Sequence, residues 1–227
     1  MTPILLLAAS VLDPAQLLKK GGFVLLLLIV FAESGLLIGF FLPGDSLLFI
    51  AGMVAAGTFA EAFPEVGAVS FGVPLWVLLG SLFLAAFLGD QVGYAFGRKT
   101  GPALFRKDDS RLFKKAYVDK AQAFFEHHGP RAIILARFVP IVRTFCPIVA
   151  GVGRMEYRTF VRYNAIGALV WGVGVTMIGY FLGSVPVVRD NIEIAILVVV
   201  AVSLGPVVVE FIRHRRHARA GESSTSS

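Results

Sequence analysis

The sequence predicts an all-α polytopic membrane protein, built as an inverted repeat with two opposed re-entrant hairpins and additional spanning helices. Three observations support this fold class. Of the 227 residues, 56% are hydrophobic and only 16% are charged, whereas soluble domains hold about 25% charged residues. Several apolar stretches are long enough to cross a bilayer, and two further apolar stretches are interrupted by proline and carry charges.

The first element, residues 1–20, is expected to be a short segment at the membrane interface. Its apolar run has no basic residues before it and ends at Asp13 and Pro14, which is not the pattern of a cleaved signal peptide. Residues 21–42 are long enough to span, although Glu33 lies in their middle. Crossing ~30 Å of hydrocarbon takes about 20 helical residues, and three more segments meet this requirement: 73–97, 163–183 and 193–212.

Residues 43–57 and 132–151 are apolar but short or broken. A broken backbone at membrane depth is tolerated only where protein buries it or a water-filled cavity borders it. We therefore predict that both pieces are re-entrant and enter from opposite faces. This arrangement places the basic residues on the cytoplasmic side, as the positive-inside rule requires; they are Lys19, Lys20, the block 98–131, Arg154, Arg158, Arg162 and the tail 213–219.

Both termini are then expected in the cytoplasm. The membrane domain covers 21–185, with halves 21–97 and 132–185, and the basic segment 98–131 connects them. Within this connector, residues 104–128 have the spacing of a basic amphipathic helix, either on the inner leaflet or as a solvated connector. Residues 186–212 add a last spanning helix, and 213–227 form a basic, then serine-rich, tail.

Short matches between the halves indicate the internal repeat. Glu33 and Arg137 each follow an alanine, and each precedes a Phe-x-Pro ending at Pro43 or Pro147 by the same distance. Chance is a competing explanation for such short matches. Inverted repeats with interrupted segments in matching positions are typical of secondary transporters. The spacing of Gly89, Gly93 and Gly97 predicts a helix face for close packing.

Two arginines in the second broken stretch are the main candidates for substrate binding. Each charge at bilayer depth costs about 2.5–3.5 kcal/mol on insertion scales. Arg137 and Arg143 are separated by Pro140 and could converge at a broken tip, where Thr144 would add a hydroxyl group. A guanidinium fork suits a phosphate or a carboxylate, so we expect these residues to bind a phosphate headgroup.

The first broken stretch carries the opposite charges, Glu33 and Asp45, on either side of Pro43 and Gly44. A carboxyl group at membrane depth can load and unload protons, and a nearby arginine opposes its protonation. A proton-coupled switch is the functional interpretation. The alternative is that the charges form salt bridges that only fix helix register.

Other candidates carry weaker signals. Asp90 is placed about 10 Å from the end of its helix, so it either supports the site or reaches the interface. Cys146 is expected to be a small buried hydrophobic residue. His127 and His128 are adjacent and do not share a helix face, so no metal site is predicted. No cofactor or nucleic-acid partner is expected, although a proton gradient is a candidate energy source.

Taken together, these motifs resemble the DedA family of bacterial SNARE-associated, or VTT, membrane proteins. The motifs that carry the resemblance lie at 31–37, 41–46, 89–94, 137–144 (with Pro140) and 150–151, within residues 20–185. The resemblance implies an inverted-repeat transporter in which Glu33, Asp45, Arg137 and Arg143 are functionally essential. It also implies membrane lipids as partners, since some members are implicated in returning undecaprenyl phosphate across the membrane.

The leading hypothesis is therefore a flippase of the inner membrane that moves undecaprenyl phosphate, a polyprenyl phosphate, between leaflets without acting as an enzyme. Phospholipid scrambling and proton-coupled export of drugs or cations are alternatives in the same class. A lipid phosphatase that uses His127 or His128 is an alternative from another class. A scaffold with purely structural ion pairs is a third.

Overall fold

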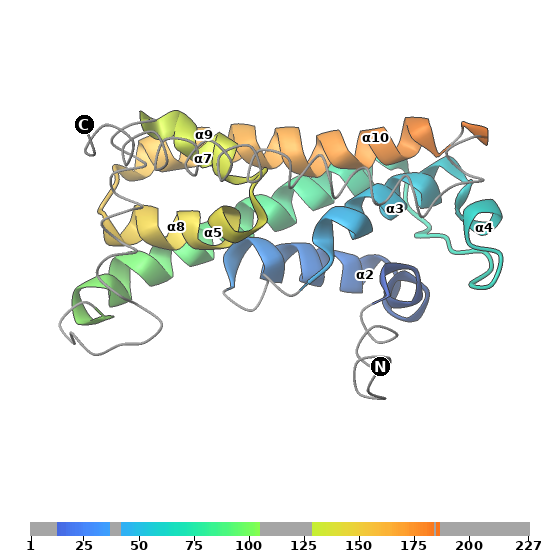
Figure 1. Cartoon of the computed structure of the whole chain (residues 1–227), viewed down its shortest axis with the longest axis horizontal. Helices are drawn as coiled ribbons and strands as arrows, with labels where there is room; N and C mark the ends of the chain where they lie inside the picture. The colour runs from blue at the N-terminus through green and yellow to red at the C-terminus, as the bar shows by residue number, and fades with distance from the viewer. Residues whose placement is uncertain (1–12, 37–41, 105–128, 184, 187–227) are drawn as a thin grey trace, which may run out of the picture.

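The computed structural model describes residues 13–36, 42–104, 129–183 and 185–186, and this part of the chain is helical without strands. Three of its helices are long and apolar enough to cross a membrane: Pro14–Gly35, Leu75–Thr100 and Tyr157–Leu182. The helices run mainly along the long axis of the molecule (Figure 1). The predicted helix 193–212, the connector with His127 and His128, and the two chain ends lie outside the described residues.

Helix α2 (Pro14–Gly35) begins where the sequence supplies a cap. The Asp13 carboxylate accepts a hydrogen bond from the Ala15 amide at 2.9 Å, and Pro14 occupies the first turn, where its missing N–H costs nothing. Gly22 adopts a positive φ of 55° and kinks the helix, as glycine permits. Figure 1 shows the first part of α2 end-on and the rest along the long axis.

Helix α2 ends before the end of the predicted spanning helix 21–42. The helix stops at Gly35, whose backbone lies against Gly89 near the middle of the 30-residue helix α5 (Leu75–Leu104). Helix α3 (Gly44–Ala56) then returns to the end from which α2 came, and α4 (Phe59–Ala62) follows there (Figure 1). Helices α2 and α3 are therefore the two arms of a first hairpin, whose tip lies near the middle of the molecule.

A second hairpin approaches from the other end. It consists of a 3-10 turn η2 (Gly129–Arg131), α7 (Ala132–Ala136) and α8 (Pro140–Val152). Helices α3 and α8 have 13 residues each, which corresponds to about 20 Å and is shorter than a ~30 Å hydrocarbon core. Two opposed hairpins agree with the predicted architecture. Their re-entry into a bilayer stays a prediction.

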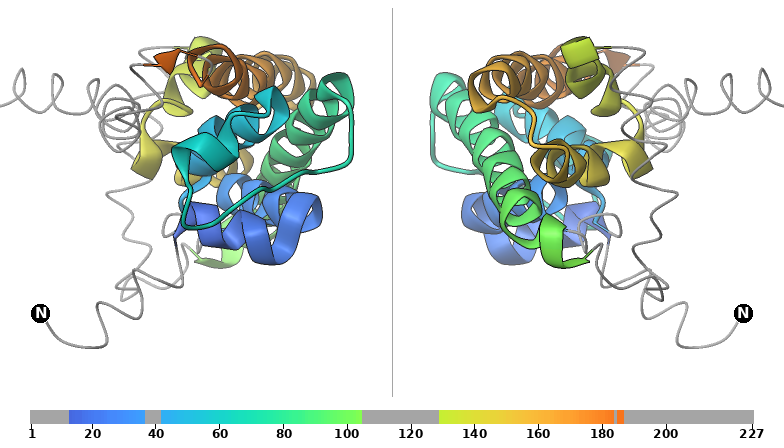
Figure 2. Two further views of the ribbon diagram at one scale, coloured as in Figure 1. Left: turned by 90° about the vertical axis from the view of Figure 1, so that its right-hand side faces the viewer. Right: turned by 90° about the vertical axis from the view of Figure 1, so that its left-hand side faces the viewer.

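The last described helix is continuous but not uniform. Helix α9 (Tyr157–Ala168) passes through one π-helical turn, η3 (Leu169–Val173), into α10 (Gly174–Leu182). Seen from one end of the molecule, α3 lies between α2 and α10, with α5 alongside (Figure 2). Together, α5 and the α9–α10 helix frame both hairpins.

Glycines allow the hairpins to pack closely on these long helices. A Cβ atom at Gly97 of α5 would overlap the backbone of Ile148 in α8, and one at Gly179 of α10 would overlap Phe49 in α3. Gly89 likewise lies against α2, so the predicted small-residue face of α5 is confirmed. The returning arm of each hairpin thus packs on the long helix of the other half in the same way, which fits the predicted repeat without testing its origin.

The exterior and interior differ in the way that a membrane protein requires. Large apolar side chains such as Val24, Leu28 and Trp76 are strongly exposed. Among the described residues, one large hydrophobic cluster unites α2, α3 and the first half of α5, and a smaller one unites α8 with α7, α9 and the second half of α5. The small cluster includes the buried Cys146, as predicted.

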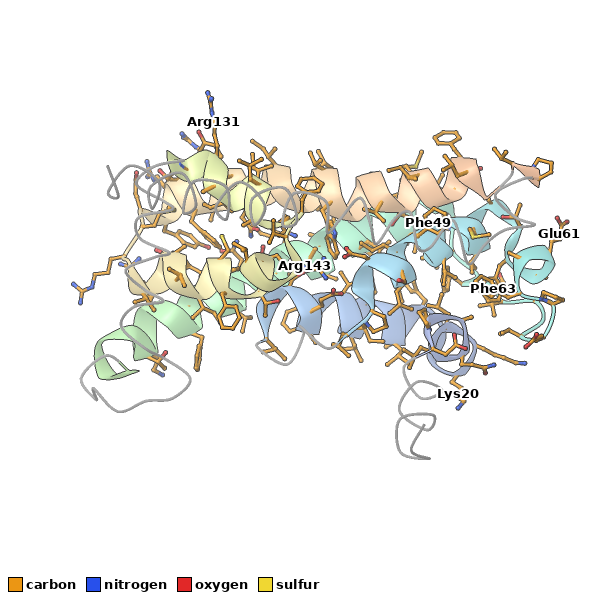
Figure 3. All side chains as sticks on the ribbon, in the orientation of Figure 1. Lys20, Phe49, Glu61, Phe63, Arg131 and Arg143 are labelled. Atoms are coloured by element: carbon orange, nitrogen blue, oxygen red, sulfur yellow. The ribbon has the colours of Figure 1, made fainter. Side chains whose placement is uncertain are left out.

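The basic residues do not all lie at one end. Lys20 lies at the α4 end with Glu61, whereas Arg131 lies at the opposite end (Figure 3). The prediction that Lys20 and Arg131 share one face of the membrane stays a prediction, although the two residues lie at opposite ends of the described structure. They do so because α2 ends at Gly35, beside the middle of α5, and α3 returns to the end where α2 began.

Candidate functional site

The tips of the two hairpins meet and bring the predicted charges together. Glu33 lies in the last turn of α2 and Asp45 in the first turn of α3. Arg137 caps the C-terminus of α7, and Arg143 lies near the start of α8. Figure 3 places Arg143 near the middle of the long axis. The sequence prediction that the two broken stretches pair their charges is met for Arg143 but not for Arg137, which pairs with Asp90 of α5.

Arg143 bridges both acids of the first hairpin. It forms an ion pair with Glu33 and donates a hydrogen bond from Nη1 to Asp45 Oδ1 at 2.8 Å. The Glu33 side chain is 1% exposed, that of Arg143 9% and that of Asp45 16%. Asp45 is therefore the most accessible member of this group, which would let a solute or proton reach it first.

Arg137 has a separate acidic partner, Asp90 of α5, with which it forms a buried ion pair. Its Nη2 also donates to Asn164 Oδ1 at 2.7 Å, and the Asn164 amide donates to the Phe87 carbonyl at 3.3 Å. The sequence left open whether Asp90 reaches the interface or supports the site. The structure buries it, because α5 runs on to Leu104 and places Asp90 near its middle.

Trp171 joins the two arginine groups and was not anticipated from the sequence. Its indole Nε1 donates to Asp45 Oδ1 at 2.7 Å. The guanidinium carbon of Arg143 lies 4.9 Å from the ring centroid and that of Arg137 lies 5.9 Å away, within the range of cation–π attraction. Trp171 occupies the π turn η3, a feature that is frequent at functional sites.

Asn164 and Trp171, which the sequence prediction missed, carry only weak signals in the sequence. Asn164 is a polar residue at the start of the predicted apolar span 163–183, and Trp171 lies mid-helix, away from the interfaces where tryptophan is enriched. Neither signal identifies a partner, since both residues meet their partners only through the packing of α9 and η3 beside the hairpin tips.

The glycines and prolines of the broken stretches shape the site. A Cβ atom at Gly44 would overlap the Glu33 carboxylate, and one at Gly167 would crowd the Arg137 side chain. Pro43 precedes α3 as its N-cap, and Pro140 opens α8. Further along the same helix, Pro147 follows Arg143 by four residues, so no amide reaches the Arg143 carbonyl in the usual helical pattern.

Two helix N-termini also face the cluster, those of α3 and α8. Each carries partial positive charge from unpaired amides, which favours an anion nearby. Asp45 in the first turn of α3 benefits from this field. Thr144, which is 1% exposed, is buried in the same region beside Arg143.

The charge balance of the cluster is uneven. Among the described residues, the three acids Glu33, Asp45 and Asp90 form ion pairs with two arginines, Arg137 and Arg143, so the five side chains carry a net charge of −1 if all are ionised. Within the described part of the chain, the Nε atoms of both arginines have no hydrogen-bond acceptor. An anion with more charge than a carboxylate could therefore replace one of these side chains. The two Nε–H groups are available as donors to it.

Comparison with known proteins gives a consistent set of relatives. Residues 42–181 match the VTT domain family. Protein DedA of Escherichia coli (strain K12) is 46% identical over 207 residues, which cover 90% of each chain. The uncharacterized membrane protein Rv0364 of Mycobacterium tuberculosis (strain ATCC 25618 / H37Rv) is 47% identical over 221 residues, covering 95% of this chain and 92% of that protein.

A more distant relative is the inner membrane protein YqjA of Escherichia coli (strain K12). It is 35% identical over 165 residues, covering 73% of this chain and 69% of that protein. No solved structure matches the chain. The names of these relatives and the three apolar helices together identify a membrane protein.

The Arg137–Asp90 pair predicts a measurable coupling energy. Asp90→Asn and Arg137→Gln each leave one buried charge without its partner, which typically costs about 3–5 kcal/mol. The double variant removes both charges and is expected to lose clearly less stability than the sum of the two single variants. Thermal unfolding of the purified protein in detergent measures this, with the exposed Arg158→Gln as a control. Additive losses would show that the two side chains are not energetically coupled.

Proposed function

We propose a transport function for this chain, which belongs to the DedA family of membrane proteins that contain a VTT domain: it carries phosphate-bearing lipids between the leaflets of the bacterial inner membrane. Undecaprenyl phosphate is the substrate that we propose first. The protein breaks no covalent bond in this scheme. It changes only which side of the membrane the headgroup faces.

The observation that carries this proposal is the pairing of Arg143 with Glu33 and Asp45. The two carboxylates occupy the positions on the guanidinium group of Arg143 that a phosphate could take. A phosphate oxygen can replace Asp45 first, because Asp45 is the most exposed of the three. Arg137, which shares the Trp171 ring with Arg143, can then contact the same headgroup.

The negative charge of the cluster supports coupling to protons. A phosphate monoester carries about −1.5 to −2 charges at pH 7, and it would be repelled by a cluster that already has a net charge of −1. Protonation of Glu33 or Asp45 removes this repulsion and frees donors of Arg143. Proton binding and phosphate binding therefore favour each other, as thermodynamic linkage requires.

The opposed hairpins suggest how a headgroup could cross. In transporters built from inverted repeats, a midplane site opens alternately to each side as one element rocks against another. Here each hairpin tip contributes part of the site, and Arg143 joins the tips through side-chain ion pairs with Glu33 and Asp45. The exposed apolar surfaces of α2 and α5 would let the lipid chains stay in the hydrocarbon while the headgroup passes between the tips.

A test of this function uses the purified protein in liposomes with a leaflet-resolved assay. Undecaprenyl phosphate is compared with phosphatidylcholine and with a cationic dye, and release of inorganic phosphate is followed in parallel. Arg143→Gln should abolish translocation, and Arg143→Lys should retain only part of it because lysine lacks the planar fork. Arg158→Gln is the matched control and should behave like the wild type.

Several results of this assay would contradict the proposal. Normal translocation by Arg143→Gln would remove the phosphate role. Release of phosphate would indicate an enzyme, movement of the dye alone an exporter, and equal movement of every lipid a general scramblase. Retained function after a charge swap, Glu33→Arg with Arg143→Glu, would indicate that the pair is only structural.

Proton coupling predicts that the pH dependence of translocation arises from Glu33 and Asp45. Translocation by the wild type should increase as the pH is lowered, since protonation of Glu33 and Asp45 frees Arg143 for the lipid phosphate. Glu33→Gln and Asp45→Asn should flatten the profile, whereas Glu65→Gln, which removes an exposed acid at the α4 end, should leave it unchanged. Identical pH profiles for all four proteins would exclude these carboxylates as the coupling groups.

A further inference from the structure

A cavity outside the central cluster lies beside the second half of α5. It has a volume of about 500 Å³, which is within the usual range for ligand pockets. Its walls come from α5 and the first residue of α9: Gln91, Tyr94, Ala95, Arg98, Lys99 and Tyr157. No acidic side chain is among these residues, so the pocket carries two positive charges.

Gln91 gives this open pocket a feature that points to a ligand. Both amide atoms of its side chain, Nε2 and Oε1, are buried and have no hydrogen-bond partner in the described part of the chain. An unpaired buried polar group costs about 1–3 kcal/mol, and such a group calls for a specific explanation. A ligand in the pocket that accepts a hydrogen bond from Nε2 would supply the missing partner.

The cationic side of the pocket is partly fixed in position. Arg98 Nη1 donates to the Tyr94 hydroxyl at 3.2 Å, and that hydroxyl donates to the Met155 carbonyl at 2.6 Å. The rings of Tyr94 and Tyr157 lie 5.6 Å apart. Arg98 is thus held beside a wall of aromatic rings. Arg98 and Lys99 are both exposed, and Lys99 adds a second positive charge.

The position of the pocket connects it to the central cluster. Gln91 directly follows Asp90, the partner of Arg137. Arg98 lies about 12 Å from Asp90 along the helix axis. The pocket therefore extends from near the depth of Arg137 toward the end of α5. Its polar donors and aromatic walls match a ligand with an anionic head and an apolar remainder.

We infer that this pocket binds the phosphate headgroup of a membrane lipid, with Arg98 and Lys99 contacting the phosphate and Gln91 donating to it. In this role the pocket is a waiting site from which the headgroup moves to Arg137 and Arg143, and that role rests on the proposed function. Binding of the headgroup in the pocket does not depend on the proposed function. Inorganic phosphate shares the chemistry of the headgroup but does not use the aromatic wall.

Binding is tested with purified full-length protein in detergent by titration calorimetry. The probes are dihexanoyl phosphatidic acid, inorganic phosphate and dihexanoyl phosphatidylcholine. Arg98→Gln combined with Lys99→Gln should weaken phosphatidic acid binding about tenfold or more. Lys20→Gln, which removes one cation at the opposite end of the molecule, should have no effect. Arg143→Gln should retain binding at the pocket.

Gln91→Leu separates a binding role from a structural one. Leucine keeps a similar size and removes the unpaired amide, so this variant should unfold no earlier than the wild type and yet bind phosphatidic acid more weakly. Unchanged affinity in both Gln91→Leu and the Arg98/Lys99 variant would overturn the assignment. Equal affinity for inorganic phosphate and phosphatidic acid would overturn the lipid part of it.

The two proposals fail in different ways. Phosphatidic acid binding that depends on Arg98 and Lys99, in a protein that moves no lipid, would support the pocket and reject the transport function. Translocation of undecaprenyl phosphate with an unchanged half-saturating lipid concentration in the Arg98/Lys99 variant would leave the transport function standing and reject the waiting site.

Discussion

The ion pairs between the hairpin tips are the contacts on which the rest of this structure depends. Two arginines and three carboxylates are buried in a chain whose surroundings are almost entirely apolar. An unpaired buried charge of this kind is strongly unfavourable, so the pairing of Arg143 with Glu33 and Asp45 stabilises both tips, and Asp90 does the same for Arg137. The glycine contacts of α5 and α10 bring the helices near enough for this pairing.

The same contacts make the site suitable for exchange. Arg143 is shared between Glu33 and Asp45, whereas Arg137 is held by Asp90 and Asn164 on the framing helices. Arg137 is thus anchored to the frame, and Arg143 is the only one of the two arginines that bridges the hairpins. Trp171 contacts both guanidinium groups and Asp45, so it links the two arginine groups.

Much of the site was visible in the sequence because charges and prolines in apolar stretches are rare. Glu33, Asp45, Arg137 and Arg143 could be named on that basis, but spacing alone could not show that Arg143 takes both acids of the first hairpin. The burial of Asp90 was harder to predict from the sequence, since it depends on where α5 ends. The apolar length of residues 21–42 predicted a span, while the turn at Gly35 that makes it a hairpin arm depends on packing against Gly89. Trp171 and Asn164 were missed because their roles arise only from tertiary contacts.

In the proposed function, a lipid phosphate replaces carboxylates on Arg143, and protons are taken up as this happens. Titration calorimetry of undecaprenyl phosphate binding, repeated in buffers with different ionisation enthalpies, counts these protons directly. We expect an uptake of roughly one proton per lipid bound near neutral pH, and a clear reduction of this uptake in Glu33→Gln. Binding with no proton uptake in the wild type would contradict this proposal.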